Sequence, residues 1–158
     1  MSLENVKEFM KSCNLEDRLM VFELSTATVP LAAKAIGCSE SQITKSLAFN
    51  VNDKYIVIAV SGDAKIDNKK FKDYFLVKAK MVKFEEVEEA IGHKAGGVCP
   101  FCLNEGVTLY LDESLKKHTH VYPAAGSANS CVRLSIEELQ SITNNPTWID
   151  VCKVEENA

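Results

Sequence analysis

The chain has 158 residues, a length typical of one domain, and 46% of them are hydrophobic and 25% charged. That composition excludes disordered and fibrous classes, and no apolar run approaches the roughly 20 residues that a membrane-spanning helix needs. The net charge of −4 argues against a protein that coats nucleic acid with its whole surface. We therefore expect one globular domain over residues 1–158, without a membrane partner.

The cysteines indicate a reducing environment. They are scattered through apolar stretches, and the first residues lack the basic and apolar regions of a signal peptide. An even number can indicate disulfides in a secreted protein, but without an export signal reduced thiols are favoured. We therefore expect a cytoplasmic protein with free thiols at Cys13, Cys38, Cys99, Cys102, Cys131 and Cys152.

The first elements of the chain are predicted from apolar periodicity. A helix is predicted over residues 3–13 and a short strand over residues 20–24. Residues 29–36 have a helical pattern, with Thr28 placed to cap the helix and Gly37 placed to end it.

A β-hairpin follows. Residues 39–42 have the spacing of a capping box and predict a short helix that ends at Lys45. Strands are then predicted over residues 46–51 and 55–60, joined by a three-residue turn. The second strand is almost continuously apolar, so we expect it in the centre of a sheet.

Positive charge is concentrated between residues 65 and 83. Seven lysines against two aspartates give this segment a local charge of +5. Helices are predicted over residues 67–75 and 84–91, the second acidic on its exposed side. The lysines are either a solvated helix surface or a patch that contacts the phosphates of a polyanion.

The C-terminal half mixes strands and helices without a strict βαβ rhythm. A Gly- and Pro-rich loop spans residues 92–106. The predicted elements after it are strands over 107–111, 120–123, 130–134 and 148–151, a helical turn over 115–118 and a helix over 135–142. The pattern predicts an α/β protein of the α+β type, with a mixed central β-sheet surrounded by helices.

Gly96-Gly97-Val98-Cys99-Pro100 is the most informative segment of that loop. The two glycines permit positive φ and a close approach of the backbone to a ligand, and Pro100 stiffens the exit. Such a loop can point backbone N–H groups at a carbonyl oxygen, which stabilises a tetrahedral intermediate. From its spacing alone, a plain connecting loop is the alternative.

Cys99 and Cys102 form a CxxC motif within the same loop. A redox pair, half of a zinc site and two reduced thiols are the three interpretations. A second ligand pair with the spacing of a structural zinc site is absent from the sequence.

Three further side chains are candidates for chemistry. Lys45, at a helix–strand junction, either binds a phosphate or carboxylate or faces solvent. His118 and His120 share one face of a strand and are either general bases or surface residues.

The order of the motifs resembles a known family. The segments that carry the resemblance are Thr28 to Ala33, Gln42 to Phe49, Val60 to Asp63, Gly96 to Pro100 and Ala125 to Ser127. Together they resemble the YbaK/ProX family of free-standing aminoacyl-tRNA editing domains, which are also found inserted in bacterial prolyl-tRNA synthetases. The resemblance covers about residues 20–151.

The resemblance implies a trans-editing deacylase that hydrolyses the ester of mischarged tRNA. The implied substrate is Cys-tRNA(Pro) or another small-amino-acid tRNA(Pro), because Ser46 carries the small hydroxyl residue of the Cys-tRNA(Pro) deacylase branch. The implied partners are tRNA and prolyl-tRNA synthetase, with no cofactor and no metal. A non-catalytic tRNA- or synthetase-binding protein is one alternative, and a CxxC thiol redox protein is another.

The resemblance also assigns site residues. The implied catalytic residues are Lys45, Gly96, Gly97 and Pro100. The implied substrate-binding residues are Thr28, Ser46, Gly62, Asp63, Val98, Cys99, Gly126 and Ser127.

Overall fold

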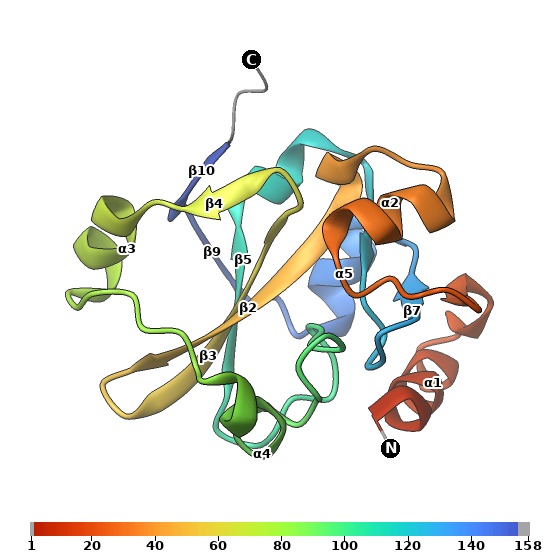
Figure 1. Ribbon diagram of the computed structural model, residues 1–158, viewed down its shortest axis with the longest axis horizontal. Coiled ribbons are helices and arrows are strands. Elements are labelled where there is room, and N and C mark those ends of the chain that lie inside the picture. Colours follow the sequence, from red (N-terminus) through yellow and green to blue (C-terminus); the bar gives the residue numbers. More distant parts are fainter. Residues whose placement is uncertain (1, 155–158) are drawn as a thin grey trace.

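The centre of the molecule is a mixed six-stranded sheet (Figure 1). The structure, a computed structural model, describes residues 2–154. The order of strands across the sheet is β8 (Leu134–Ser135), β6 (His120–Pro123), β2 (Ile43–Val51), β3 (Lys54–Ser61), β5 (Thr108–Asp112) and β9 (Thr147–Ile149). β2–β3 and β6–β8 are antiparallel, and the other neighbours are parallel. The predicted hairpin, the central place of its second strand and the mixed sheet are confirmed.

Two short ribbons flank this sheet. β1 (Leu19–Val21) pairs with β7 (Ser130–Val132), and β4 (Ala64–Ile66) pairs with β10 (Cys152–Val154). β4 and β10 were not predicted, because three residues are too short to establish an alternating pattern. The strand predicted over residues 130–134 is divided into β7 and β8.

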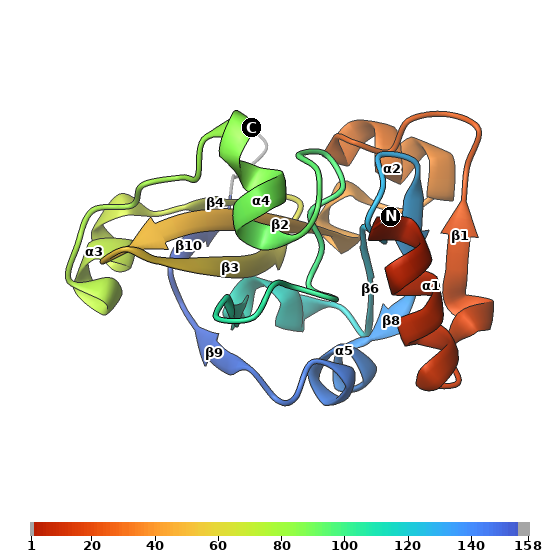
Figure 2. The same cartoon turned by 90° about the horizontal axis from the view of Figure 1, so that it is seen from below.

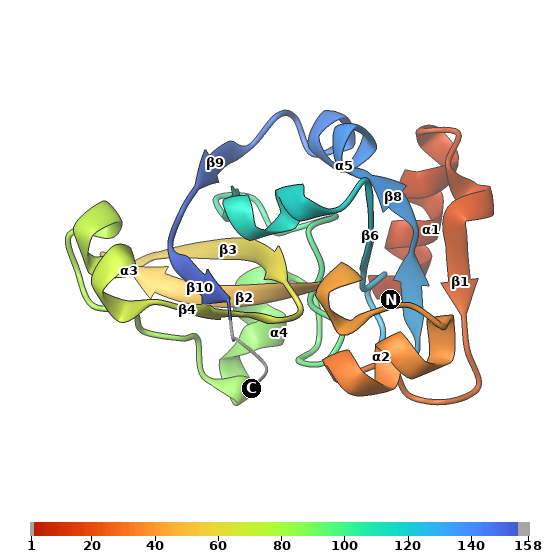
Figure 3. The same cartoon turned by 90° about the horizontal axis from the view of Figure 1, so that it is seen from above.

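Helices cover both sides of the sheet. The α-helices are α1 (Ser2–Ser12), α2 (Val29–Ile36), α3 (Asn68–Phe75), α4 (Val87–Ile91) and α5 (Ile136–Ile142). The 3₁₀ turns are η1 (Glu16–Arg18), η2 (Glu40–Gln42), η3 (Phe84–Glu86) and η4 (Glu113–Lys117). Figures 2 and 3 show α2 and α4 on one side of the sheet and α5 on the other, with α1 and α3 at opposite ends.

Local signals set the bounds of α2 as predicted. The Thr28 hydroxyl accepts a hydrogen bond from the Leu31 N–H at 3.4 Å, and Gly37 ends the helix with φ of 83°. The capping box at Ser39 and Gln42 is also present, but it begins only the 3₁₀ turn η2. The β-branched pair Ile43-Thr44 already belongs to β2, so the expectation that Lys45 ends a helix is wrong. Lys45 is the third residue of β2.

The hairpin carries a different apolar cluster on each face. Phe49 and Ile58 pack with Phe71 of α3, while Ala48 and Val57 pack with Val87 of α4. The period-2 alternation of a strand produces this division, and it fixes which side chains of β2 face α4. Across residues 2–154, no helix combines the length and apolarity that a membrane crossing needs.

Phe71 is expected to anchor α3 to the sheet. Its ring is buried, and the ring centroids of Phe49 and Phe75 lie 5.1 and 4.6 Å away. Phe71→Ala should lower the free energy of unfolding by about 3–5 kcal/mol in a urea titration. Tyr74→Ala on the same helix should cost only about 1 kcal/mol because that ring is half exposed. Equal losses in the two variants would contradict this packing.

Candidate functional site

A cavity of about 480 Å³ lies between the β2 edge, α2 and α4. Its size is in the range of small-molecule sites, and its lining is mostly apolar. β2 supplies Ile43 to Ala48, and Thr26 to Val29 with Ala32 come from α2 and the loop before it. The remaining lining residues are Met81, Val82, Phe84, Val87, Ala95, Gly96, Val98, Tyr122, Ala124 and Cys131.

The cavity opens onto an unpaired stretch of β2. β6 pairs with this edge only at Ile43 and Thr44, and the next contact along it is the bridge between Phe49 and Met81. Two hydrogen bonds flank this bridge: the Val82 N–H donates to the Ala48 carbonyl at 3.0 Å, and the Asn50 N–H donates to the Lys80 carbonyl at 2.9 Å. Backbone groups of a strand in an antiparallel pair alternate in direction, so the N–H and C=O of Ser46 point to this same edge.

Two hydroxyl groups of β2 are also without partners. Within the described residues, Thr44 Oγ1 and Ser46 Oγ are buried and make no hydrogen bond. Both residues line the cavity. A buried hydroxyl without a partner is energetically unfavourable, so its presence beside a cavity points to a ligand that satisfies it.

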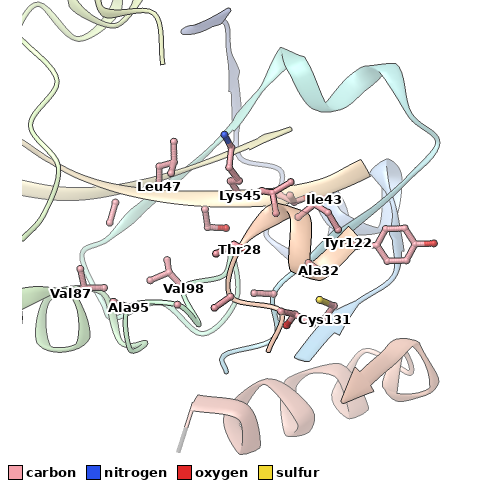
Figure 4. Close-up of a pocket in the computed structure, with 18 of the residues that line it drawn as sticks. Thr28, Ala32, Ile43, Lys45, Leu47, Val87, Ala95, Val98, Tyr122 and Cys131 are labelled. Carbon is pink, nitrogen blue, oxygen red and sulfur yellow. The ribbon is translucent and has the colours of Figure 1, made fainter. Parts of the chain in front are cut away.

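Lys45 is the single charged residue among the described residues that line the cavity. Its ammonium group donates to the Ala64 carbonyl oxygen at 2.5 Å. Figure 4 shows this ammonium on the opposite side of β2 from Thr28 and Val98, as strand alternation requires. Burial lowers the pKa of Lys45 from its ordinary value, although Cys152 and Asp63 partly oppose the shift.

The Gly96–Pro100 loop has two halves with different surroundings. Gly96 and Val98 line the cavity, and Gly96 adopts φ of 88°. Cys99 and Pro100 are buried, and Pro100 instead lies on a second hollow beside Phe9 and Phe101. The first half of the loop therefore faces the cavity, while the second half anchors it.

Gly97 lies where this loop crosses the turn at Gly126. A Cβ on Gly97 would be 2.9 Å from the Gly126 carbonyl and the Ser127 nitrogen, so only glycine fits. The Gly97 N–H points to the Lys94 and Ala95 carbonyls at 2.9 and 3.0 Å. The Gly97 N–H is therefore used within the loop and does not face a ligand. In the described chain, the N–H groups of Gly96 and Val98 have no such backbone acceptor.

The CxxC motif is part of the loop anchor. Cys99 is buried, with its sulfur 3.4 Å from His93 Nε2 and 3.6 Å from the Phe101 carbonyl. Burial raises the pKa of Cys99 far above its ordinary value, so the reactive thiolate is disfavoured. Cys102 is a free cysteine in an exposed position. Its thiol is partly buried, and this burial raises its pKa. Among residues 2–154, no group of three or more His, Cys, Asp and Glu could hold a metal ion.

Four other sequence-assigned residues lie outside the cavity lining. A Cβ on Gly62 would be 2.0 Å from the Glu40 carbonyl oxygen, and a Cβ on Gly126 would be 2.8 Å from the Ser2 carbonyl. Asp63 accepts a hydrogen bond from Lys117 at 2.6 Å, and Ser127 donates to Asn129 at 2.8 Å. These residues fix the turns around the cavity.

The two histidines also lie outside the lining. His118 Nε2 is 2.7 Å from the hydroxyl of Ser41, and His120 Nδ1 is 3.3 Å from the hydroxyl of Thr119. Both hydrogen bonds are at or near the surface, which favours the interpretation of these histidines as surface residues.

Several lining residues were missed from the sequence. Thr44 had a usable signal, because it is two residues before Ser46 on the same face of a strand. Tyr122 and Cys131 had none, because Tyr122 is placed by its pairing with Ile43, and Cys131 by its pairing with Met20 and its bridge to Ala124. Met81 and Phe84 belong to a segment whose place along β2 depends on its bridge to Phe49.

The arrangement can hold a small acyl group and donate hydrogen bonds to its oxygen. The candidate donors are the Thr44 and Ser46 hydroxyls, the Ser46 amide, and the amides of Gly96 and Val98, which line the cavity and have no backbone acceptor in the described chain. Donors that are fixed in a site poor in water stabilise developing negative charge more strongly than water does.

Relatives are found across the whole chain. The uncharacterized protein YwhH of Bacillus subtilis (strain 168) is 47% identical over 154 residues, which are 97% of this chain and 98% of YwhH. The proline–tRNA ligase of Bacillus pumilus (strain SAFR-032) is 32% identical over 105 residues, which are 65% of this chain but 18% of the ligase.

Solved structures share the fold. The hypothetical protein APE2540 has a TM-score of 0.84 at 29% identity, covering 94% of this chain and 99% of that one. A candidate trans-editing enzyme for prolyl tRNA synthetase has a TM-score of 0.84 at 28% identity, covering 99% of this chain and 98% of its own.

The family model described as the aminoacyl-tRNA editing domain matches residues 24–142, which include every residue that lines the cavity. The resemblance read from the order of the motifs is therefore confirmed, and this chain belongs to the aminoacyl-tRNA editing domain family.

Proposed function

We propose that this protein is a trans-editing deacylase that hydrolyses the ester bond of mischarged tRNA. The observation that carries the proposal is the open edge of β2, where unpartnered hydroxyls and outward-pointing backbone groups face an apolar cavity. An aminoacyl ester has a carbonyl oxygen that these donors fit and a side chain that the apolar wall fits. Membership of the editing family supports the same reaction.

In the proposed reaction, the aminoacyl group occupies the cavity and water attacks its carbonyl carbon. The Gly96 and Val98 amides stabilise the oxyanion, and Gly97 holds them in place by its close contact with Gly126. The bond between the carbonyl carbon and the ribose oxygen then breaks, releasing a free amino acid and the tRNA hydroxyl. For a cysteinyl substrate, its own thiol is an alternative nucleophile: a C–S bond forms as the bond to the ribose oxygen breaks, the thiol proton passes to that oxygen, and the product released is a cyclic thiolactone.

Lys45 is proposed to bind the phosphate at the 3′ end of the tRNA. Lys45 is the one charged residue among the described residues of the lining, and a lysine is a point charge well suited to phosphate. Its ammonium is bonded to Ala64 in the structure, so binding requires the flexible side chain to turn around the open strand edge.

The proposed substrate is tRNA(Pro) charged with cysteine or another small amino acid. The similarity to prolyl-tRNA ligases and to a candidate trans-editing enzyme for prolyl tRNA synthetase supports this tRNA and that synthetase as partners. A synthetase pocket that selects amino acids by size alone distinguishes two that differ by one methylene only about 10–200-fold. A separate editing site removes the mischarged products that this limited selectivity allows.

The first test is a deacylation panel with Cys-, Ala- and Ser-charged tRNA(Pro). The wild type should hydrolyse at least one of them, and Lys45→Ala should reduce kcat/KM by about tenfold or more through loss of a charged contact. Lys69→Ala is the matched control, because Lys69 is on the surface and paired with Asp73 at 2.8 Å. A wild type that binds tRNA without hydrolysing any substrate would support a non-catalytic binder instead.

The pH profile tests the charge of Lys45. Because burial lowers the pKa of this lysine, its ammonium form is lost at a lower pH than that of an exposed lysine. Activity, corrected for spontaneous hydrolysis, should therefore fall as the pH rises and begin to fall below the ordinary lysine range. Lys45→Arg should retain activity at the highest pH tested. An identical alkaline decline in the arginine variant would show that another group titrates.

A substitution at Thr44 tests whether a buried hydroxyl without a hydrogen-bond partner binds the substrate. Thr44→Val keeps the shape of the side chain and removes a buried hydroxyl that has no partner, so the Tm should stay the same or rise. The value of kcat/KM should fall about three- to tenfold, the cost of one hydrogen bond to the substrate. A variant with a lower Tm and unchanged kcat/KM would assign the hydroxyl a purely structural role.

A further inference from the structure

The proposed function places a nucleotide at the mouth of the cavity. The aminoacyl ester is carried by the ribose of the terminal nucleotide of tRNA, so that nucleotide lies next to the acyl group. When the acyl group occupies the cavity, the terminal base lies within reach of residues at its rim. A role for those rim residues in holding the nucleotide rests on the proposed function.

The rim of the cavity carries two large apolar side chains that are exposed and are not packed in the hydrophobic core. Phe84 is 80% exposed and Met81 is 58% exposed, yet both line the cavity. Phe84 is the first residue of η3, and no ring in the described structure packs against it. An exposed aromatic ring at a cavity mouth offers a flat surface on which a nucleobase can stack.

The segment that carries these side chains is held firmly to the sheet. Met81 bridges to Phe49, and hydrogen bonds of 3.0 and 2.9 Å join Val82 to Ala48 and Asn50 to Lys80. Val82 and Val87, on either side of Phe84, are buried in the core cluster below α4. The ring is therefore presented from a fixed backbone, which lowers the entropy lost on binding.

Positive and negative charges lie on different sides of Phe84 along the chain, so a polyanion is attracted to one side only. Lys78, Lys80 and Lys83 precede the ring and are exposed, and none of them makes an ion pair with another described residue. Exposed glutamates follow it in η3 and α4, at Glu85, Glu86, Glu88 and Glu89. Phosphates are attracted to the lysine side and repelled from the α4 side.

We propose that Phe84 stacks on the terminal base of tRNA, while Lys80 and Lys83 bind phosphates of the unpaired 3′ end. The occupant of this exposed rim is thus single-stranded RNA, chosen over a protein surface because of the lysines beside the ring. Phe84 is a positioning residue: it holds the nucleotide so that the ester reaches the cavity, and it contacts no reacting atom.

The experiment measures the Kd of a fluorescein-labelled, uncharged RNA hairpin that ends in an unpaired CCA. Phe84→Ala should weaken binding about five- to 150-fold, the range for losing one base–aromatic stack. Phe84→Trp should restore wild-type affinity, and Phe84→Leu should not, because leucine lacks a ring face. Leu76→Ala is the matched control, because Leu76 is equally exposed at 80% and is not on the cavity rim.

A second probe, the same hairpin with an abasic terminal nucleotide, identifies the stacking partner. The wild type should bind it as weakly as Phe84→Ala binds the normal hairpin, and the variant should lose nothing further. Lys80→Ala and Lys83→Ala should each reduce the slope of log Kd against log salt by about 0.7, and Lys69→Ala should not.

The inference is separable from the proposed deacylase activity because uncharged RNA needs no hydrolysis. If the wild type hydrolyses no charged tRNA but the Phe84 and abasic effects persist, the stacking assignment stands. If Phe84→Ala binds the hairpin as the wild type does, the assignment is overturned. It is also overturned if that variant loses affinity only for prolyl-tRNA synthetase, since the rim would then be a protein-binding surface.

Discussion

The site depends on incomplete pairing along one edge of β2. β3 pairs with this strand from Thr44 to Val51, whereas the other edge is paired only near its two ends. A further strand along that edge would fill the space that the cavity occupies. Backbone N–H and C=O groups need partners when buried, so an open stretch in the interior of a sheet is a natural binding position.

A second constraint is the crossing of two backbones at Gly97 and Gly126. Their contact is too close for any side chain at Gly97, and it holds the loop against the turn. The buried Cys99 and Pro100 then fix the rest of the loop, which leaves Gly96 and Val98 at the cavity. The CxxC motif thus has a structural explanation in packing, and the redox interpretation has no geometric support at Cys99.

The sequence was most informative where a pattern is local. The continuous apolar run of β3 predicted the centre of the sheet, the cap at Thr28 predicted the start of α2, and the helix predicted over residues 135–142 is present as α5. Lys45 was misplaced because the capping box at residues 39–42 was extended too far, into the β-branched pair that begins β2. The order of the motifs identified the family, which no single motif does.

The part of the site that could not be predicted depends on long-range contacts. Tyr122 and Cys131 reach the cavity through pairings of β6 and β7 that local propensity does not specify. The unpaired stretch of β2 beside Ser46 could not be predicted either, because it depends on where β6 and the segment around Met81 stop pairing with β2. Gly62 and Gly126 carried the family pattern, and the structure shows that a side chain at either would collide with backbone.

The central claim is that the acyl group of the substrate binds at the open edge of β2. The most direct measurement is an amide NMR titration with an amide-linked, non-hydrolysable aminoacyl-adenosine analogue. We expect shifts centred on the amides of Ser46, Gly96 and Val98, and no shift at the second hollow around Phe9 and Phe101. Shifts confined to that second hollow, or none at saturating analogue, would contradict it.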